Sequence, residues 1–375
     1  MALQLSGERF VATYRLTAGD EAGARARAED ICIEQTIEFP ADLVDEPAIR
    51  EQVFGRVERL EAAGEGRFEA AISFAVESAG AELPQLLNVL FGNISIKPGI
   101  RLHRFEAPPA LLSAFRGPRF GRAGVRELLG VAERPLLCTA IKPMGLSLDR
   151  LADQAYRYAL GGVDLIKDDH GFADQPFAPF DQRVDLFSRA VARANDETGG
   201  HSRYCPSVSG PDGQTLHRAR FARRAGAGGL LVAPGLVGPD TMRAVADDDA
   251  IGLPVLAHPA LQGSFVVSQE HGISHGCLFG QLNRLAGADA VIFPHAGGRF
   301  SFSMDECRDL AHGTETPMPG VAPIFPVPAG GMSVERVPEI VEFYGRDVML
   351  LIGGDLHRHG PDLAQNCRRF RELVE

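Results

Sequence analysis

The sequence lacks paired cysteines, clusters of basic residues and long apolar segments, and each absence excludes a class of protein. Its six cysteines are scattered and form no C-x-x-C pair, which argues against a disulfide framework or structural zinc and predicts reduced, mostly buried thiols. No Lys/Arg run accompanies the net charge of −11, so no nucleic-acid or membrane partner is expected. No run of about 18 apolar residues could cross a membrane, and the N-terminal segment MALQLSGERF has no signal-peptide pattern. We therefore expect a cytoplasmic protein whose partners are small molecules or further copies of itself.

The first third of the chain has the pattern of a small α+β domain. With 375 residues, 45% of them apolar, the whole chain can bury a large core. A connector rich in Gly, Pro and Arg at residues 116–124 predicts a domain boundary near 120, and so an N-terminal domain of residues 1–120. Within that domain, strand-like runs cover residues 10–16, 31–39, 68–76 and 100–105, and a helical pattern covers 83–91.

Residues 121–375 consist of short apolar runs separated by segments long enough for a helix, which is typical of parallel βα units. Eight such units in roughly 250 residues predict a (β/α)8 barrel. The candidate strands are residues 136–142, 162–167, 204–208, 229–233, 254–258, 290–295, 323–327 and 348–352.

Polar residues follow these strands where a barrel builds its chemistry, at the C-terminal ends. They are Lys142, Lys167 to His170, His258, His295, and the glycine pairs Gly330-Gly331 and Gly353-Gly354. Asp169 is the clearest candidate ligand for a hard cation such as Mg²⁺, which prefers oxygen donors. Glycine pairs after the last two strands suit a phosphate, because their backbone N–H groups are unobstructed.

Each of these features also has a structural interpretation. Lys167, Asp168 and Asp169 could equally form an ion-pair network beneath a loop, since such networks are common in barrels. Glycine pairs also form turns. A single histidine is more often structural than catalytic, but His258 and His295 at one barrel mouth favour acid–base chemistry or phosphate contact.

Two motifs make the sequence recognisable. Residues 161–169 (GGVDLIKDD) resemble the metal-site motif of the RuBisCO superfamily large chain, and residues 139–147 (TAIKPMGLS) resemble its strand-1 lysine motif. The resemblance extends over nearly the whole chain, which is similar to a form IV RuBisCO-like protein. It implies that Lys167 is carbamylated by CO2 and holds Mg²⁺, or Mn²⁺, together with Asp169. His170 stands where the family has a metal-binding glutamate, so its role there is open.

The same resemblance assigns further residues. Lys142 matches the lysine beside the carbon that loses a proton, and His258 and His295 match histidines of strands 5 and 6. Glu34 matches a family glutamate and Asn93 a family asparagine, which in the family reach into the active site of a partner subunit. The resemblance therefore implies a homodimer with its active site at the subunit interface.

The departures from the family pattern affect the residues that serve a second phosphate or CO2. Pro259 replaces the arginine that grips a second phosphate, Ala329 replaces a serine, and residues 295–301 contain no loop lysine to position CO2. Carboxylation of ribulose bisphosphate is therefore not expected. Both glycine pairs remain, so we expect a singly phosphorylated ketose, such as 5-methylthioribulose 1-phosphate, to be enolised by a metal-dependent proton-transfer isomerase.

Other functions stay open. The closest alternative is a decarboxylase or carboxyl-transferring hydrolase of a 3-oxo sugar-acid phosphate, of the 3-oxo-isoapionate 4-phosphate type. A non-catalytic regulatory protein is a further alternative. The family's diketone enolases carry a lysine where this chain has Asn93 and a glutamate where it has His170, which disfavours that activity.

Overall fold

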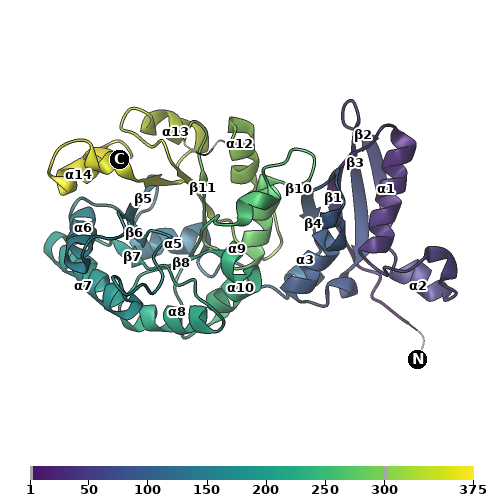
Figure 1. The fold of residues 1–375 in the computed structure, drawn as a ribbon, viewed down its shortest axis with the longest axis horizontal. Coiled ribbons are helices and arrows are strands. Elements are labelled where there is room, and N and C mark those ends of the chain that lie inside the picture. The colour runs from purple at the N-terminus through teal and green to yellow at the C-terminus, as the bar shows by residue number, and fades with distance from the viewer. Residues whose placement is uncertain (1–2, 299, 301) are drawn as a thin grey trace.

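The chain forms two β-sheets that lie side by side (Figure 1). The computed structural model describes residues 3–298, 300 and 302–375. Arg299 and Ser301, which belong to the predicted loop without a lysine, lie outside the described residues. The larger sheet has eight parallel strands in the order β7-β6-β5-β13-β12-β11-β9-β8. A parallel bridge between Ser207 and Leu231 joins its two ends. The predicted (β/α)8 barrel with a smaller α+β part is confirmed.

All eight predicted barrel strands are present. They are β5 (Leu136–Ile141), β6 (Leu165–Asp168), β7 (Arg203–Cys205), β8 (Leu230–Val232), β9 (Val255–Ala257), β11 (Ala290–Pro294), β12 (Phe325–Ala329) and β13 (Met349–Ile352). The helices of this part are α5 (Gly121–Leu129), α6 (Leu148–Leu160), α7 (Phe180–Thr198), α8 (Gln214–Arg224), α9 (Pro234–Val237), α10 (Pro239–Asp247), α11 (Asn283–Leu285), α12 (Met304–Gly313), α13 (Val337–Tyr344) and α14 (Leu363–Glu372), with the π-helix η5 (Gly276–Leu282) and the 3-10 helix η6 (Gly354–His357).

Alternation along the barrel strands separates two cores. Side chains such as Leu136, Cys138 and Leu165 pack with one another in the barrel interior, whereas Leu137 and Ile166 belong to the larger cluster that includes the surrounding helices. Successive residues of a strand point to opposite faces, so every second residue faces the barrel interior and the residues between them face the helices. The same alternation decides which polar residues after the strands can reach the barrel mouth.

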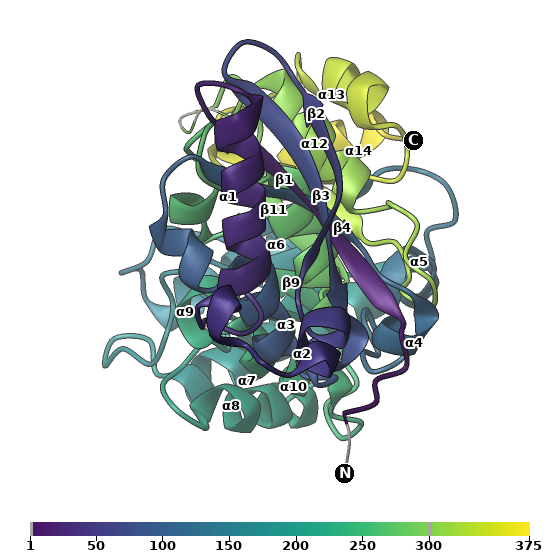
Figure 2. The same cartoon turned by 90° about the vertical axis from the view of Figure 1, so that its right-hand side faces the viewer.

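The smaller sheet is mostly antiparallel, in the order β10-β4-β1-β3-β2. Helix α1 crosses its outer face, nearest the viewer in Figure 2. The elements are β1 (Arg9–Thr17), α1 (Glu21–Glu34), α2 (Pro47–Gln52), β2 (Arg56–Ala62), β3 (Arg67–Ala75), α3 (Leu83–Phe91), β4 (Ile100–Glu106), α4 (Pro109–Leu112) and β10 (Gly272–Ile273). β10 comes from the loop after β9 and pairs in parallel with β4. The domain boundary near residue 120 stays a prediction.

The strand predicted over residues 31–39 is wrong. Ile31 belongs to α1, whose N-terminus is capped by the Asp20 side chain. The buried positions of α1 are Ala24, Ala28, Ile31 and Cys32, and this spacing of three to four residues is that of a helix face. The β-branched residues at the end of the helix gave a strand-like local pattern, but burial of that face against the sheet decides for a helix.

His103 lies on β4, where the small sheet meets η5. Its Nε2 lies 3.2 Å from a guanidinium nitrogen of Arg15. Burial lowers the pKa of His103 to about 4, and the positive charge of Arg15 adds to the effect. The imidazole is therefore neutral in the folded protein at neutral pH, whereas in an unfolded chain it would titrate near its ordinary pKa of about 6.5.

His103 is expected to make the fold sensitive to mild acid. Between pH of about 6.5 and about 4, the unfolded chain binds a proton here that the folded chain does not, so stability falls as pH falls. The loss is up to about 1.4 kcal/mol per pH unit. When the free energy of unfolding is measured with urea at several pH values, it should change less steeply with pH for His103→Gln than for the wild type. The same pH dependence of the unfolding free energy in both proteins would contradict this assignment.

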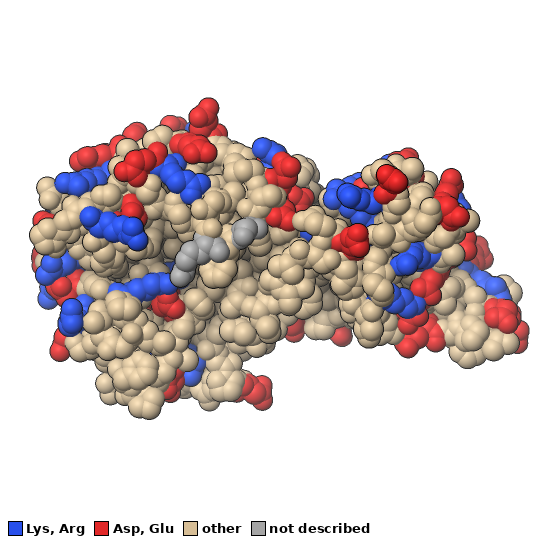
Figure 3. Space-filling view, turned by 45° about the horizontal axis from the view of Figure 1, so that its top comes forward, with Lys and Arg blue, Asp and Glu red and all other residues tan. Residues whose placement is uncertain are grey.

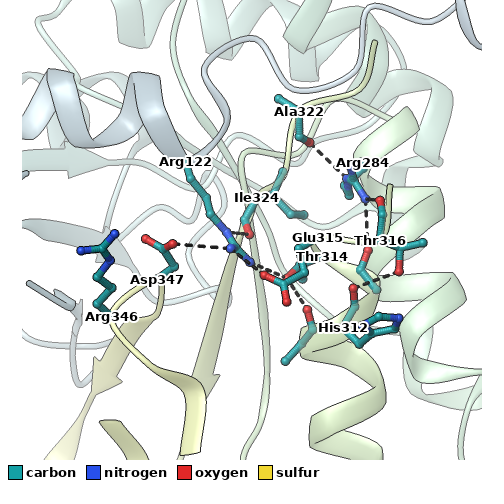
Figure 4. Close-up of polar contacts among 12 residues, drawn as sticks. Arg122, Arg284, His312, Thr314, Glu315, Thr316, Ala322, Ile324, Arg346 and Asp347 are labelled. Carbon is teal, nitrogen blue, oxygen red and sulfur yellow. Dashed lines mark hydrogen bonds and ion pairs between the residues drawn. The ribbon is translucent and has the colours of Figure 1, made fainter. Parts of the chain in front are cut away.

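Arg284 on α11 ties the barrel to the segment before β12 (Figure 4). The side chain is 1% exposed. Its guanidinium donates to four backbone carbonyls, those of Gly313, Thr316, Val321 and Ala322. Nearby, Arg122 donates to the carbonyl of Ile324. These bonds satisfy carbonyls of an irregular segment, which lacks the regular backbone hydrogen bonds of a helix or sheet.

The surface carries charges of both signs. Figure 3 shows Lys/Arg and Asp/Glu side chains interspersed on the face drawn. Among the residues described, no helix has the length and apolarity needed to span a bilayer. All six cysteines are free and buried, as the scattered spacing predicted; they are Cys32, Cys138, Cys205, Cys277, Cys307 and Cys367.

Candidate active site at the barrel mouth

An ion pair between Lys142 and Asp169 lies at the C-terminal ends of β5 and β6. Lys142 Nζ is 2.6 Å from Asp169 Oδ2, and the Lys142 side chain is 48% exposed. The backbone N–H of Gly171 donates to Asp169 Oδ1 over 2.8 Å. Burial opposes ionisation of Asp169, but the hydrogen bonds from Lys142 and Gly171 prevail and lower the pKa of the carboxyl. The mouth therefore presents an ionised carboxylate beside a lysine that solvent can reach.

Lys167 lies beneath this pair and is 3% exposed. Its Nζ donates to the backbone carbonyl of Asp168 over 3.0 Å. Burial lowers the pKa of Lys167, and the charge of Lys142 adds to this, although Asp169 opposes it. A lysine with a lowered pKa has more of the neutral amine, the form that reacts with CO2.

Two stacked histidines complete the cluster. The rings of His170 and His258 lie 4.2 Å apart at an angle of 16°. Burial lowers the pKa of His258 to about 2, and the charge of Lys167 adds to the effect. The Nδ1 of His258 accepts from the backbone N–H of Ala260 over 3.2 Å, so the proton of the neutral ring is on Nε2. Burial also lowers the pKa of His170.

Asp168 is separate from the mouth. It is fully buried and pairs with the equally buried Arg183 over 3.1 Å. It also accepts from the hydroxyl of Tyr204 and the N–H of Ser207. The structural interpretation of the Lys-Asp-Asp cluster is thus correct for Asp168, while Lys167 and Asp169, one residue away on either side, point to the other face of the strand.

The donors at the mouth fit a hard cation only if Lys167 is modified. Asp169 Oδ1 and His170 Nδ1 lie 3.4 Å apart, which brings one carboxylate and one imidazole together. Among the described residues, no group of three or more His, Cys, Asp or Glu side chains is arranged to hold a metal. A carbamate on Lys167 would add the oxygen donor that Mg²⁺ or Mn²⁺ requires beside Asp169.

Three of the four glycines in the two pairs have open space beside their backbone. A Cβ built on Gly330, Gly353 or Gly354 would meet no atom within 4 Å. Gly330 and Gly331 have φ of 85° and 68°, a region that favours glycine. Unobstructed N–H groups after β12 and β13 are the arrangement that the phosphate hypothesis requires.

His295 is not in contact with the Lys142 cluster. It is 2% exposed, and its Nδ1 lies 3.0 Å from the hydroxyl of Tyr344 on α13. Burial lowers its pKa, and the charge of Arg336 adds to the effect. His295 is thus held against α13, and its backbone N–H donates to the carbonyl of Ala329 on β12.

Glu34 and Asn93 form a second cluster in the small domain. Asn93 Nδ2 donates to Glu34 Oε1 over 3.2 Å, and Lys97 Nζ lies 3.2 Å from Glu34 Oε2. The hydrogen bond from Lys97 lowers the pKa of Glu34, and that from Asn93 adds to it. Glu34 ends α1, on the side of the small sheet turned away from the barrel of the same chain (Figures 1 and 2).

Lys97 was missed by reasoning from the sequence, although a signal for it exists. The chain has 38 basic residues, but its only lysines are Lys97, Lys142 and Lys167. Two of these are at the barrel mouth, and the third contacts Glu34. All other basic residues are arginines, so lysine is present only where candidate site residues cluster. The stacking of His170 on His258 had no signal in the sequence, because the two residues are far apart in the chain.

The chain is similar over its length to proteins related to RuBisCO. The model of the family "Ribulose bisphosphate carboxylase large chain, catalytic domain" matches residues 121–371. Ribulose bisphosphate carboxylase-like protein 1 of Rhodopseudomonas palustris is 45% identical over 367 residues, 98% of each chain. The 5-methylthioribulose-1-phosphate isomerase of Rhodospirillum rubrum is 45% identical over 365 residues, 97% of this chain and 95% of the relative. A crystal structure of a Rubisco-like protein from Rhodopseudomonas palustris has a TM-score of 0.88 at 42% identity, covering 98% of this chain and 97% of that one.

Proposed function

Because the chain belongs to the RuBisCO large-chain family, among its RuBisCO-like members, we propose that it is an isomerase of a singly phosphorylated ketose. The observation that carries this proposal is the 2.6 Å pair of Lys142 and Asp169, a proton-transferring group beside a carboxylate at the barrel mouth. The similarity to an isomerase of 5-methylthioribulose 1-phosphate suggests that compound as the substrate, and favours isomerisation over decarboxylation of a sugar acid.

In the proposed reaction, one proton leaves a carbon next to the substrate carbonyl and one proton is added to a different carbon, so atoms and charge balance. Lys142 moves this proton. To accept it, Lys142 must first leave Asp169 and lose its own proton. The neutral His258 donates from Nε2 to a substrate oxygen and stabilises the enediol. The glycine pairs after β12 and β13 hold the phosphate and fix the reacting carbons beside Lys142.

A divalent cation, Mg²⁺ or Mn²⁺, would be held by Asp169 and carbamylated Lys167, with His170 beside it. When bound, it would polarise the substrate carbonyl as a Lewis acid. The support for this assignment is the buried position of Lys167 and the lowered pKa of its amine.

Replacing Lys167 is expected to abolish metal binding at this site. Lys167→Ala should lower metal-dependent turnover by about 100-fold or more, because the carbonyl would lose electrostatic stabilisation. Lys167→Arg keeps a cation but cannot form a carbamate, so it should be equally impaired. The ¹³C-carbamate signal after addition of labelled bicarbonate and Mg²⁺ should be lost in both variants. Full activity of either variant would refute the carbamate assignment.

The rim beside the ion pair suits an apolar substrate end. Met144, two residues after Lys142, is 47% exposed. The thioether of Met144 contacts the amide of Gln175, and its methyl would lie 3.6 Å from a Cβ on Gly171. An apolar surface next to the loop that carries Asp169 fits a methylthio group better than a second phosphate.

Glu34 and Asn93 are proposed to act in a second subunit. They contact each other, Glu34 also contacts Lys97, and α1 faces away from the barrel of its own chain (Figure 2). A homodimer in which this face meets the barrel mouth of the partner would bring them to Lys142. Sedimentation of the purified protein as a monomer at the concentration of the assay would exclude this arrangement.

The experiment that tests the proposed function is proton NMR in D2O with Mg²⁺ and bicarbonate. The protein is offered 5-methylthioribulose 1-phosphate and, in a separate tube, a 3-oxo sugar-acid phosphate. We expect deuterium to enter the first compound as an isomer accumulates. Release of CO2 or a carboxylate from the second compound instead would establish the decarboxylase or hydrolase, and no change in either would refute the isomerase.

A further inference from the structure

Arg336 lies directly behind the glycine loop that follows β12. It precedes α13, and its Nη1 donates to the carbonyl of Gly331 over 3.0 Å. Its Nη2 donates to the carbonyl of Ala296 over 3.1 Å. Gly331 belongs to the loop after β12 and Ala296 to the loop after β11. One guanidinium therefore joins two neighbouring loops of the barrel mouth.

The guanidinium of Arg336 lies close to the backbone of Gly331. A Cβ on Gly331 would lie 2.7 Å from Nη1 of Arg336, and one on Gly297 would lie 3.4 Å from Nη2. Gly331 also has a φ of 68°. A side chain at Gly331 would displace the guanidinium, whereas a Cβ on Gly297 would only touch it, so Arg336 packs most closely against Gly331.

The charge of Arg336 is not offset by an acid. Its guanidinium donates to carbonyl groups, and no carboxylate of the described residues forms an ion pair with it. The charge also reaches His295, whose pKa it lowers further than burial alone does. An uncompensated, half-buried cation beside open backbone N–H groups attracts an anion.

We propose that Arg336 is a positioning residue for the phosphate of the substrate, which fixes the loops after β11 and β12 against each other and supplies positive charge to the cradle of Gly330 and Gly331. This proposal rests on the proposed phosphate site and adds to it a residue outside the glycine motifs. Removing the guanidinium should weaken phosphate binding while proton transfer at Lys142 continues.

The test compares Arg336→Met with Arg336→Lys and with the matched variant Arg308→Met. Arg308 is a nearby arginine on α12 that pairs with Asp305 and lies over the ring of Phe343. Binding of inorganic phosphate is measured by titration calorimetry on the full chain, and KM and kcat are measured with 5-methylthioribulose 1-phosphate. We expect Arg336→Met to weaken phosphate binding and raise KM about tenfold, with kcat within twofold, the effect of one charge-assisted contact. Arg336→Lys should recover part of the affinity, and Arg308→Met should resemble the wild type.

Equal phosphate affinity of Arg336→Met and the wild type would overturn the proposal, as would a loss confined to kcat. A wild type that turns over the substrate but whose KM is unchanged by Arg336→Met would leave the isomerase intact and refute only the role of Arg336. A melting temperature lowered in Arg336→Met but not in Arg336→Lys, with phosphate binding unchanged in both, would make Arg336 a structural clip and overturn the proposal.

Discussion

Replacing Lys142 with methionine is expected to slow exchange of the carbon-bound substrate proton with solvent by about 10³-fold, within the range for loss of a positioned acid or base. Substrate binding should stay within about threefold, because the glycine loops and Arg336 are not in contact with Lys142. The measurement is the rate of deuterium incorporation, together with substrate affinity from calorimetry.

Lys142→Arg is the informative control. Arginine can keep an ion pair with Asp169, the partner that Lys142 contacts at 2.6 Å, but it does not lose its proton at accessible pH. If Lys142 moves the proton, both variants should be inactive. If its charge alone stabilises the enediol, Lys142→Arg should retain activity. Unchanged exchange in Lys142→Met would assign the proton transfer to another group, with His258 the next candidate.

Replacing Arg284 with methionine is expected to destabilise the protein by about 3–5 kcal/mol. The variant leaves four carbonyls without the donors that the guanidinium supplies, and the bonds to Gly313 and Val321 are buried. Each unsatisfied buried group costs about 1–3 kcal/mol, with partial recovery through water. Burial lowers the pKa of Arg284 to about 10, so the side chain is still charged at neutral pH. The measurement is urea unfolding of both proteins.

The matched control for Arg284 is Arg189→Met on α7. Arg189 is 67% exposed and pairs with Asp185 one helical turn away, so its loss should change the unfolding free energy by less than about 0.5 kcal/mol. An equally small loss for Arg284→Met would show that water replaces the guanidinium, and the network in Figure 4 would then contribute little.

The sequence alone was sufficient for the barrel, because eight apolar strands with regular spacing are a local signal that repeats along the chain. It also predicted candidate site residues at the ends of these strands, since the C-terminal ends of parallel strands meet at one mouth. Its error, the strand expected over residues 31–39, arose where β-branched residues end a helix and the sheet beneath α1 determines the outcome.

Only the tertiary structure decided which candidate residues lie at the barrel mouth and which lie in the core. Adjacent in sequence, Asp168 and Asp169 have opposite environments, since one pairs with the buried Arg183 and the other with Lys142. His170 and His258 stack although they are 88 positions apart in the sequence. Arg336 could not be distinguished from the other arginines until its contacts with Gly331 and Ala296 were known.

The physical reason for this division is the range of the interactions. Hydrophobic periodicity and the residues that follow each strand are local features of the chain, so the sequence by itself determined the fold class and the family and predicted candidate residues for the mouth. Burial, charge pairing and ring stacking depend on segments that are distant in sequence, so only the folded chain assigns Lys167 a lowered pKa, places Asp168 in the core and puts Arg336 behind the glycines.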